Sequence, residues 1–313
     1  MKDLNVDFPL DDFEKLISKI GWQTLNEWFE FWNIKKDLLL IDKFWDNKVK
    51  DDWIWGLALP LLSQAYVFNK NSNERKIIGI SALPGTGKTT LGEWLENISL
   101  KLNFKISVVS LDDFYLPYEE MNLAIKNNPW NVSRGFPGTH SIELMKNTLL
   151  NWKKDGQLSV PVFDKSLRNG LGDRAHWRQE RPDLLIIEGW FLGVNSFSLE
   201  LDNMEKYLPP LTPSESSYRV NIQNNLKHYS DIWILIDQLW HLKPLEFEYM
   251  NLWKSNQEKK MLIKRGSALV DEKLFNFLRM LNTSIPHKSF DNINSDVLLM
   301  VNQERKLINV GIN

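Results

Sequence analysis

The stretch that decides the fold is IIGISALPGTGKTTLGEWL, residues 77–95. It reads as a short apolar β-strand, a glycine-rich loop and a helix that begins at Lys88. Residues 82–89 fit the pattern G-x-x-x-x-G-K-[ST], whose backbone N–H groups point inward at phosphate groups. The amino terminus of the following helix adds its positive end to such a site. Ala82 replaces the first glycine of the pattern, the smallest change possible there. We therefore expect this loop to bind a nucleoside triphosphate.

The loop pattern also assigns roles to individual residues. Lys88 is expected to contact the β- and γ-phosphates, and the hydroxyl of Thr89 to be a ligand of Mg²⁺. Gly85 and Gly87 permit backbone conformations and a close approach that a Cβ atom would prevent. The predicted ATP-binding residues are Leu83, Pro84, Gly85, Thr86, Gly87, Lys88, Thr89 and Thr90.

Further short apolar runs lie at 106–109, 184–187, 232–236 and 297–301, separated by segments of helix length. Runs that are apolar at nearly every position are typical of strands buried on both faces of a parallel sheet. We predict an α/β fold with a doubly wound parallel sheet and helices on both faces. Ligands bind such sheets at the carboxyl ends of the strands.

Acidic residues follow two of the predicted strands. Glu188 ends the run 184–187, where a carboxylate linked to Mg²⁺ is expected, and Gly189 permits a close turn after it. The alternative is that Glu188 caps a strand or pairs with a surface lysine. Asp112 and Asp113 follow the run 106–109 at the same sheet edge, where a carboxylate could orient and deprotonate an acceptor hydroxyl. A pair of acids that is merely solvated is the alternative. We choose Asp112 as this acid because it is the first one past the strand.

The first 70 residues are rich in tryptophan: six of the 14 tryptophans precede residue 56. Trp28, Phe31 and Trp32 recur at helical spacing, so residues 1–70 are predicted to be a helical extension. Its aromatic side chains are expected to pack on the rest of the protein, and a dimer or partner surface is the alternative. The polar run 70–75 is predicted to be a linker, followed by a second domain over 71–313.

Composition limits the class of protein. The chain is 43% hydrophobic and 25% charged with a formal net charge of -2, which is ordinary for a globular protein and argues against a nucleic-acid partner. No apolar run is long enough to span a membrane, and the acidic amino-terminal segment lacks the apolar core of a signal peptide. With no cysteine, the chain forms neither disulfides nor thiolate metal sites. We expect a cytoplasmic location.

Six segments together resemble the D-glycerate 3-kinase family of plants, fungi and bacteria, a branch of the P-loop kinases related to uridine kinase, phosphoribulokinase and bacterial pantothenate kinase. The resemblance covers roughly residues 76–290. The segments are 81–90, 110–117, RGFPGTH at 134–140, PVFDKS at 161–166, GDR at 172–174 and IEGWFLG at 187–193.

The resemblance implies phosphorylation of D-glycerate by ATP to 3-phosphoglycerate, a step that ends the photorespiratory glycerate pathway in photosynthetic organisms. It also implies a sheet of order 2-3-1-4-5 and a mobile lid. In the related uridine-kinase pattern an acid stands three residues before a tyrosine, which again selects Asp112 through Tyr115. Two positions depart from the family: Ser141 stands where many members carry an acid, and Phe163 where a tyrosine is usual.

Glycerate is a small hydroxylated anion, so its site needs a cation for the carboxylate and a few hydrogen-bond donors. The predicted catalytic residues are Lys88, Asp112 and Glu188, with Thr89 and Glu188 as metal ligands. The predicted substrate-binding residues are Asp113, Tyr115, Arg134, His140, Lys165 and Arg174. For each of the three cations a structural ion pair is the alternative, and His140 could instead only brace its loop.

A lid is predicted near 255–266, with Lys260, Lys264 and Arg265 as cations that approach the phosphates. A solvated helix face is the alternative. Two other functions stay open: a kinase of another small acceptor, such as pantothenate or uridine, and a nucleotide-binding regulatory module. Whether the protein is a monomer or a homodimer is also left open.

Overall fold

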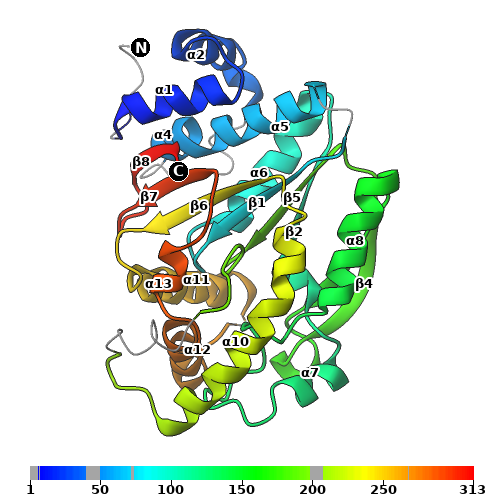
Figure 1. The fold of residues 1–313 in the computed structure, drawn as a ribbon, viewed down its shortest axis with the longest axis vertical. Coiled ribbons are helices and arrows are strands. Elements are labelled where there is room, and N and C mark those ends of the chain that lie inside the picture. Colours follow the sequence, from blue (N-terminus) through cyan, green and yellow to red (C-terminus); the bar gives the residue numbers. More distant parts are fainter. Residues whose placement is uncertain (1–5, 7, 40–49, 72–73, 198–206, 267) are drawn as a thin grey trace.

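The computed structural model describes residue 6 and residues 8–39, 50–71, 74–197, 207–266 and 268–313 (Figure 1). Its centre is a six-stranded sheet of order β2-β5-β1-β6-β7-β8. The first five of these strands pair in parallel, and β8 pairs antiparallel with β7. Numbered along the chain, the five parallel strands have the order 2-3-1-4-5, so the predicted fold class is confirmed. The bounds are β1 Ile77–Ala82, β2 Ile106–Ser110, β5 Leu184–Gly189, β6 Gln238–Pro244, β7 Val297–Val301 and β8 Leu307–Ile312.

The prediction of a strand at 232–236 was wrong. Helix α10 (Pro213–Trp233) occupies the start of this run, a turn follows, and the strand β6 begins only at Gln238. Ile232 is buried because it continues the helical spacing of Leu226 and Tyr229, whereas Ile234 is 80% exposed. The sequence of the actual strand, QLWHLKP, gives a weak strand signal because it mixes buried polar residues with apolar ones.

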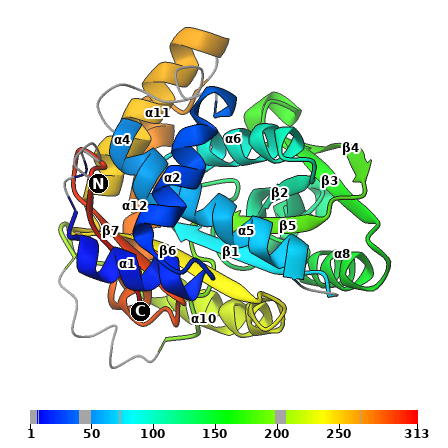
Figure 2. The same ribbon diagram turned by 90° about the horizontal axis from the view of Figure 1, so that it is seen from above.

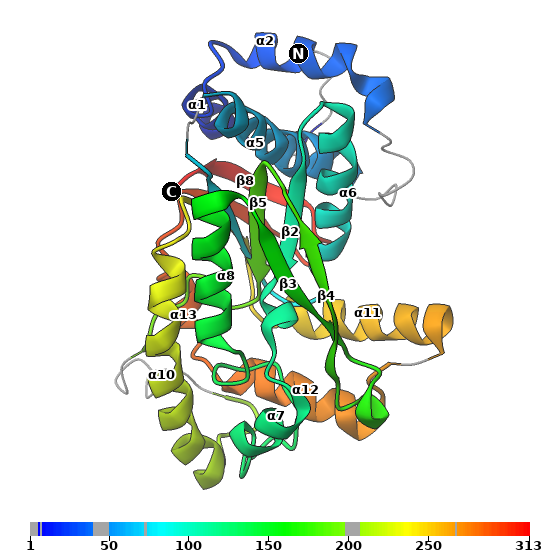
Figure 3. The same cartoon turned by 90° about the vertical axis from the view of Figure 1, so that its right-hand side faces the viewer.

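The two faces of the sheet support separate apolar cores. Alternate residues of a strand point to opposite faces, so Ile78 and Ile80 join one core and Ile77 the other. The first core is completed by α5 (Leu59–Asn71) and α6 (Lys88–Lys101), the second by α8 (Ile142–Asp155) and α10. Figure 3 shows α8 and α10 on one side of the strands and α6 on the other.

The tryptophan-rich amino-terminal segment forms α1 (Leu10–Lys19), α2 (Leu25–Ile34), the short helices η1 (Lys36–Leu38) and α4 (Lys50–Trp53), and a π-helical turn, η2 (Ile54–Ala58), that leads into α5. Figure 2 shows these helices from above, stacked over one end of the sheet. Trp28 and Trp32 are buried, and both donate a hydrogen bond to the hydroxyl of Ser63 in α5. Trp45 and residues 72–73 of the predicted linker lie outside the described residues.

A separate antiparallel hairpin, β3 (Leu158–Asp164) and β4 (Asp173–Glu180), was not predicted. The sequence of β4, DRAHWRQE, is polar because most of its residues are half-buried or exposed, so it lacks the apolar signal of a strand. Side chains from α6, β4 and the short helix after β2 cover the outer edge of β2. Its outward N–H groups donate to side chains: Ile106 to Ser99 (3.1 Å), Val108 to Glu96 (2.8 Å) and Ser110 to Asp113 (2.9 Å).

The remaining helices are η3 (Leu111–Phe114), α7 (Tyr118–Ala124), η4 (Arg168–Gly170), α11 (Tyr249–Arg265), α12 (Asp271–Thr283) and α13 (Lys288–Asp291). In Figure 3, α11 projects away from the sheet. A membrane-spanning helix is not found in the described part of the chain, because no helix there combines sufficient length and apolarity.

Candidate active site

The phosphate loop joins the end of β1 to the start of α6, at the carboxyl edge of the sheet. Gly85 and Gly87 have left-handed backbone angles, with φ of +80° and +116°. A Cβ atom on Gly85 would lie 2.6 Å from the carbonyl carbon of Trp253 in α11, closer than two carbon atoms can approach. Glycine is therefore required at position 85 both by its φ angle and by the backbone of the neighbouring helix.

Gly85→Ala is expected to weaken nucleotide binding about 5- to 150-fold, because a strained φ alone costs roughly 1–3 kcal/mol. Titration calorimetry with ADP measures the change. Gly266→Ala is the matched control, since Gly266 also has a positive φ (+67°) but no atom within 4 Å of an added Cβ. Unchanged ADP affinity in a folded Gly85→Ala protein would contradict this account of the loop.

Lys88 and Glu188 face each other beside the loop. Strand pairing sets Glu188 of β5 opposite Ile80 of β1, and its carboxylate lies 3.9 Å from the Lys88 ammonium. Lys88 Nζ also donates to the carbonyl oxygens of Ala82 (2.7 Å) and Leu83 (3.2 Å). Burial lowers the pKa of Lys88 and raises that of Glu188, while the attraction between the two charges opposes both shifts. The pair thus places a cation and a carboxylate next to the expected phosphates.

Gly189 allows the short helix η3 (Leu111–Phe114) to pack close to Lys88 and Glu188. A Cβ atom on Gly189 would lie 2.3 Å from Cδ1 of Leu111, the first residue of η3. The close packing of η3 on the end of β5 brings the two acids of η3 to the same sheet edge as Glu188.

The two acids of η3 have different surroundings. The Asp112 carboxylate accepts hydrogen bonds from Lys165 Nζ and from the Tyr115 hydroxyl, both at 2.7 Å. Burial alone would raise the pKa of Asp112, but the charge of Lys165 and the hydrogen bonds from Lys165 and Tyr115 together hold it below its usual range. Asp113 instead accepts the N–H of Ser110, and burial raises its pKa to about 6. Asp112 is therefore an ionised carboxylate with a lysine beside it, and Asp113 caps the strand.

His140 braces the loop RGFPGTH against η3. Its ring stacks on Tyr115 with centroids 4.5 Å apart, and its Nδ1 lies 2.7 Å from the hydroxyl of Tyr229. The Tyr229 hydroxyl also accepts the N–H of Gly138 (3.2 Å), so it connects His140 to the backbone of its own loop. Burial lowers the pKa of His140 to about 4, which keeps the ring neutral. Trp190, from the IEGWFLG motif, donates to the Gly135 carbonyl and fixes the other end of this loop.

The three predicted acceptor-side cations make different contacts. Arg174 donates from Nε to the Tyr115 carbonyl (3.1 Å) and from Nη2 to the Ser141 hydroxyl (2.6 Å). Ser141 thus accepts from this arginine where many family members carry an acid. Arg134 donates through Nη1 to the carbonyls of Gly170 and Leu171, and so supports the turn between β3 and β4. Lys165, described above, is the cation in direct contact with Asp112.

The predicted lid residues Lys260 and Lys264 lie on α11 with exposed side chains, and the side chain of Arg265 is outside the described residues. A different lysine of α11 was missed. Lys254 is mostly buried and pairs with Glu258 at 2.5 Å. Burial lowers its pKa. Its backbone nitrogen lies 2.8 Å from the position that a Cβ atom on Gly85 would occupy, so Lys254 lies beside the phosphate loop. In the sequence Lys254 and Glu258 look like any helical ion pair, four residues apart.

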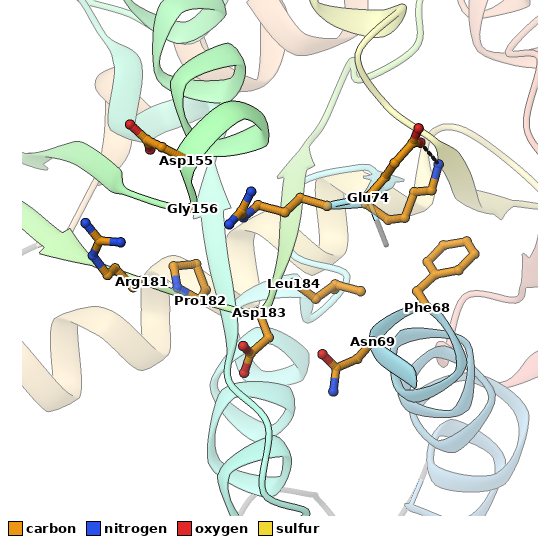
Figure 4. A pocket seen from close by; sticks show the side chains of 11 residues that line it. Phe68, Asn69, Glu74, Asp155, Gly156, Arg181, Pro182, Asp183 and Leu184 are labelled. Carbon is orange, nitrogen blue, oxygen red and sulfur yellow. Dashed lines mark hydrogen bonds and ion pairs between the residues drawn. The ribbon is translucent and has the colours of Figure 1, made fainter. Parts of the chain in front are cut away.

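A cavity of about 290 Å³ lies at the opposite end of the sheet, where β1 and β5 begin (Figure 4). Several of its charged groups make structural contacts: Lys76 pairs with Glu74, and Arg75 donates to the carbonyls of Lys153 and Lys154 at the end of α8. The cavity holds none of the residues of the phosphate loop or of η3. The candidate active site is therefore the carboxyl edge of the sheet.

Comparisons with known proteins agree with this geometry. The uncharacterized kinase mug58 of Schizosaccharomyces pombe is 31% identical over 213 residues, 64% of this chain and 76% of that protein. The chloroplastic D-glycerate 3-kinase of Arabidopsis thaliana is 31% identical over 215 residues, 64% of this chain but only 45% of that protein. Among solved structures, D-glycerate 3-kinase from Cryptococcus neoformans has a TM-score of 0.66 at 23% identity, over 90% of this chain and 96% of that one. This likeness shows the same fold.

Other similar proteins carry the names pantothenate kinase, at 30% identity, and putative uridine kinase, at 25%. No protein-family model matches the chain. The chain belongs to the P-loop kinases, the family that includes glycerate, pantothenate and uridine kinases. Its similarity to these kinases makes it an ATP-dependent kinase that phosphorylates a small molecule.

Proposed function

We propose that this kinase transfers the γ-phosphoryl group of ATP to the 3-hydroxyl of D-glycerate. The observation that carries the proposal is the Asp112–Lys165 pair, which combines a carboxylate for an acceptor hydroxyl with a cation for an acidic acceptor. The six motifs shared with the D-glycerate 3-kinase family support the same acceptor, as does the similarity to the Arabidopsis enzyme of that name.

In this proposal Lys88 leaves the carbonyls of Ala82 and Leu83 and contacts the β- and γ-phosphates. Asp112 orients the acceptor hydroxyl and receives its proton. Its lowered pKa makes it a weak base, so its main task is to hold the hydroxyl in line with the phosphate while charge develops. Lys165 lies next to Asp112 and is 52% exposed, so it is free to turn toward the carboxylate of the acceptor.

We also propose that Mg²⁺ accompanies ATP. The Thr89 hydroxyl and the Glu188 carboxylate are oxygen donors, the kind of ligand that Mg²⁺ prefers. Within the described residues no group of three acidic or histidine side chains could hold a metal ion by itself. Two protein ligands fit a magnesium ion that takes its other ligands from phosphates and water. When bound, the ion would neutralise charge on the phosphates.

The acceptor is tested by measuring ADP release with D-glycerate, L-glycerate, pantothenate, uridine and ribulose 5-phosphate. We expect turnover with D-glycerate to exceed turnover with each other compound, and phosphorus NMR to show 3-phosphoglycerate as the product.

A product phosphorylated at the 2-position, or a preference for pantothenate, would overturn the acceptor assignment but leave the kinase class intact. Pantothenate is the second candidate because it also carries a carboxylate that Lys165 could bind. ATP hydrolysis at one rate with every acceptor would favour a nucleotide-binding regulatory module.

A further inference from the structure

The amino-terminal segment reaches the phosphate loop through Trp53, the last residue of α4. Trp53 is only 2% exposed. Two carbon atoms of its indole ring lie 3.5 and 3.6 Å from the position that a Cβ atom on Gly87 would occupy. A methyl group on Gly87 would therefore make ordinary van der Waals contact with the ring, so the ring faces the last glycine of the loop at close range. The segment predicted to pack on the rest of the protein therefore also touches the nucleotide site.

A second contact runs from Trp53 to the loop through the turn between β7 and β8. Trp53 Nε1 donates to the carbonyl oxygen of Arg305 at 2.6 Å, and Arg305 Nη1 donates to the carbonyl oxygen of Gly85 at 3.2 Å. Arg305 has a left-handed φ of +66°, which a non-glycine residue keeps only where neighbouring groups hold it. The Trp53 hydrogen bond to its carbonyl is one such restraint.

The direction of the Gly85 carbonyl affects how the phosphate loop can bind its ligand. A trans peptide points its C=O and its N–H in opposite directions, so fixing this carbonyl also fixes the direction of the Thr86 N–H. The direction of the N–H groups decides whether a phosphate loop can bind its ligand. This peptide joins Gly85 to Thr86, and glycines with positive φ stand at its first residue, Gly85, and directly after its second, at Gly87.

The same turn is held from its other side by Trp253 of α11. Trp253 is 3% exposed, and its Nε1 donates to the carbonyl oxygen of Gln303 at 2.6 Å. The backbone of Trp253 is also the group that closes the space next to Gly85. Two buried indoles from distant parts of the chain thus fix one turn, and Arg305 connects that turn to the loop.

We propose that Trp53 and Arg305 are positioning residues for the nucleotide: the amino-terminal segment holds the phosphate loop in its binding conformation through the β7–β8 turn. Neither residue belongs to the phosphate-loop pattern or to the motifs shared with the glycerate kinases. The inference rests on the P-loop and does not depend on which acceptor is phosphorylated.

The test is Trp53→Phe, which keeps an aromatic side chain in the buried site but removes the N–H donor and the outer edge of the indole that faces Gly87. We expect the Kd for ADP and the KM for ATP to rise about 5- to 10-fold, the effect of one lost hydrogen bond of about 1 kcal/mol or slightly more. The KM for the acceptor stays unchanged. Arg305→Met is expected to have the same effect. Because the two residues act in series, the double variant loses no more ADP affinity than either single variant.

Trp32→Phe is the matched control, because it removes an indole hydrogen bond of the same segment, to Ser63 at 2.9 Å, without contact to the loop. It is expected to lower Tm and leave the Kd for ADP as in the wild type. Equal losses of ADP affinity in Trp32→Phe and Trp53→Phe, or unchanged affinity in both Trp53→Phe and Arg305→Met, would overturn the proposal. ADP titration needs no acceptor, so failure of the glycerate assignment would not affect the result.

Discussion

Lys88→Met lowers kcat by about 10²–10³-fold or more, the expected loss when a group that stabilises developing phosphate charge is removed. Lys88 lies buried between the loop carbonyls and Glu188, with no second lysine in the loop to replace it. A methionine fills a similar volume, so the fold is expected to persist. Coupled ADP release measures kcat, and circular dichroism verifies the fold.

Lys101→Met is the control for this substitution, because Lys101 is an exposed lysine at the other end of the same helix, α6. It should keep wild-type turnover. Wild-type turnover in a folded Lys88→Met protein would mean that the loop is not the site from which phosphate is transferred.

Asp112→Asn is expected to lower kcat by about 10²–10⁴-fold, because asparagine has no negative charge to orient the acceptor hydroxyl or to receive its proton, while ADP affinity stays the same. Asparagine preserves the shape of the side chain and can still bond to the Tyr115 hydroxyl. It removes the negative charge that Lys165 stabilises and that the acceptor proton requires. Single-turnover measurements with saturating ATP separate this loss in the chemical step from any change in product release.

Asp113→Asn is the matched control, one residue away, and should cost far less turnover. Its folded pKa of about 6 lies above the ordinary value of 3.8, so ionisation of Asp113 opposes folding. The wild type therefore loses stability from this group as pH rises from about 4 to 6, and Asp113→Asn should not. Unfolding in urea at several pH values shows the difference. If the two variants exchange their effects on kcat, Asp113 is the base and Asp112 is not.

The elements that could be predicted from the sequence carry local signals. The glycine-rich loop, the strand ending at Glu188 and the acids after β2 each lie within a few residues of the pattern that reveals them, and strand pairing brings them to one edge. Trp53, Lys254 and Arg305 carry no such signal. Trp53 and Arg305 are 252 residues apart, and Arg305 and Gly85 are 220 residues apart. Lys254 reaches the site through the packing of α11 on Gly85. The strand β6 was misplaced because its buried positions include Gln238 and His241.

The roles of the acceptor-side cations could not be read from their motifs either. Arg134 and Arg174 both look like candidates for binding an anion, since each lies in a glycine-rich stretch. In the folded chain both guanidinium groups make structural hydrogen bonds. Arg134 donates to the carbonyl of Leu171 and joins the RGFPGTH loop to the hairpin. Arg174 donates to the Tyr115 carbonyl and the Ser141 hydroxyl and joins the hairpin to the residues after η3 and after the RGFPGTH loop. Only the distance from Lys165 to Asp112 distinguishes the third cation, and that distance depends on the β3–β4 hairpin.

The covered edge of β2 protects the molecule against aggregation in a concentrated protein solution. An exposed edge strand is a template onto which a strand of a neighbouring molecule can add, the first step of aggregation. An incoming strand would have to displace Ser99, Glu96 and Asp113 from the outward N–H groups, and Arg178 from the carbonyl of Val108. Asp113, next to the proposed catalytic acid, thus helps to prevent a strand of a second molecule from pairing with β2.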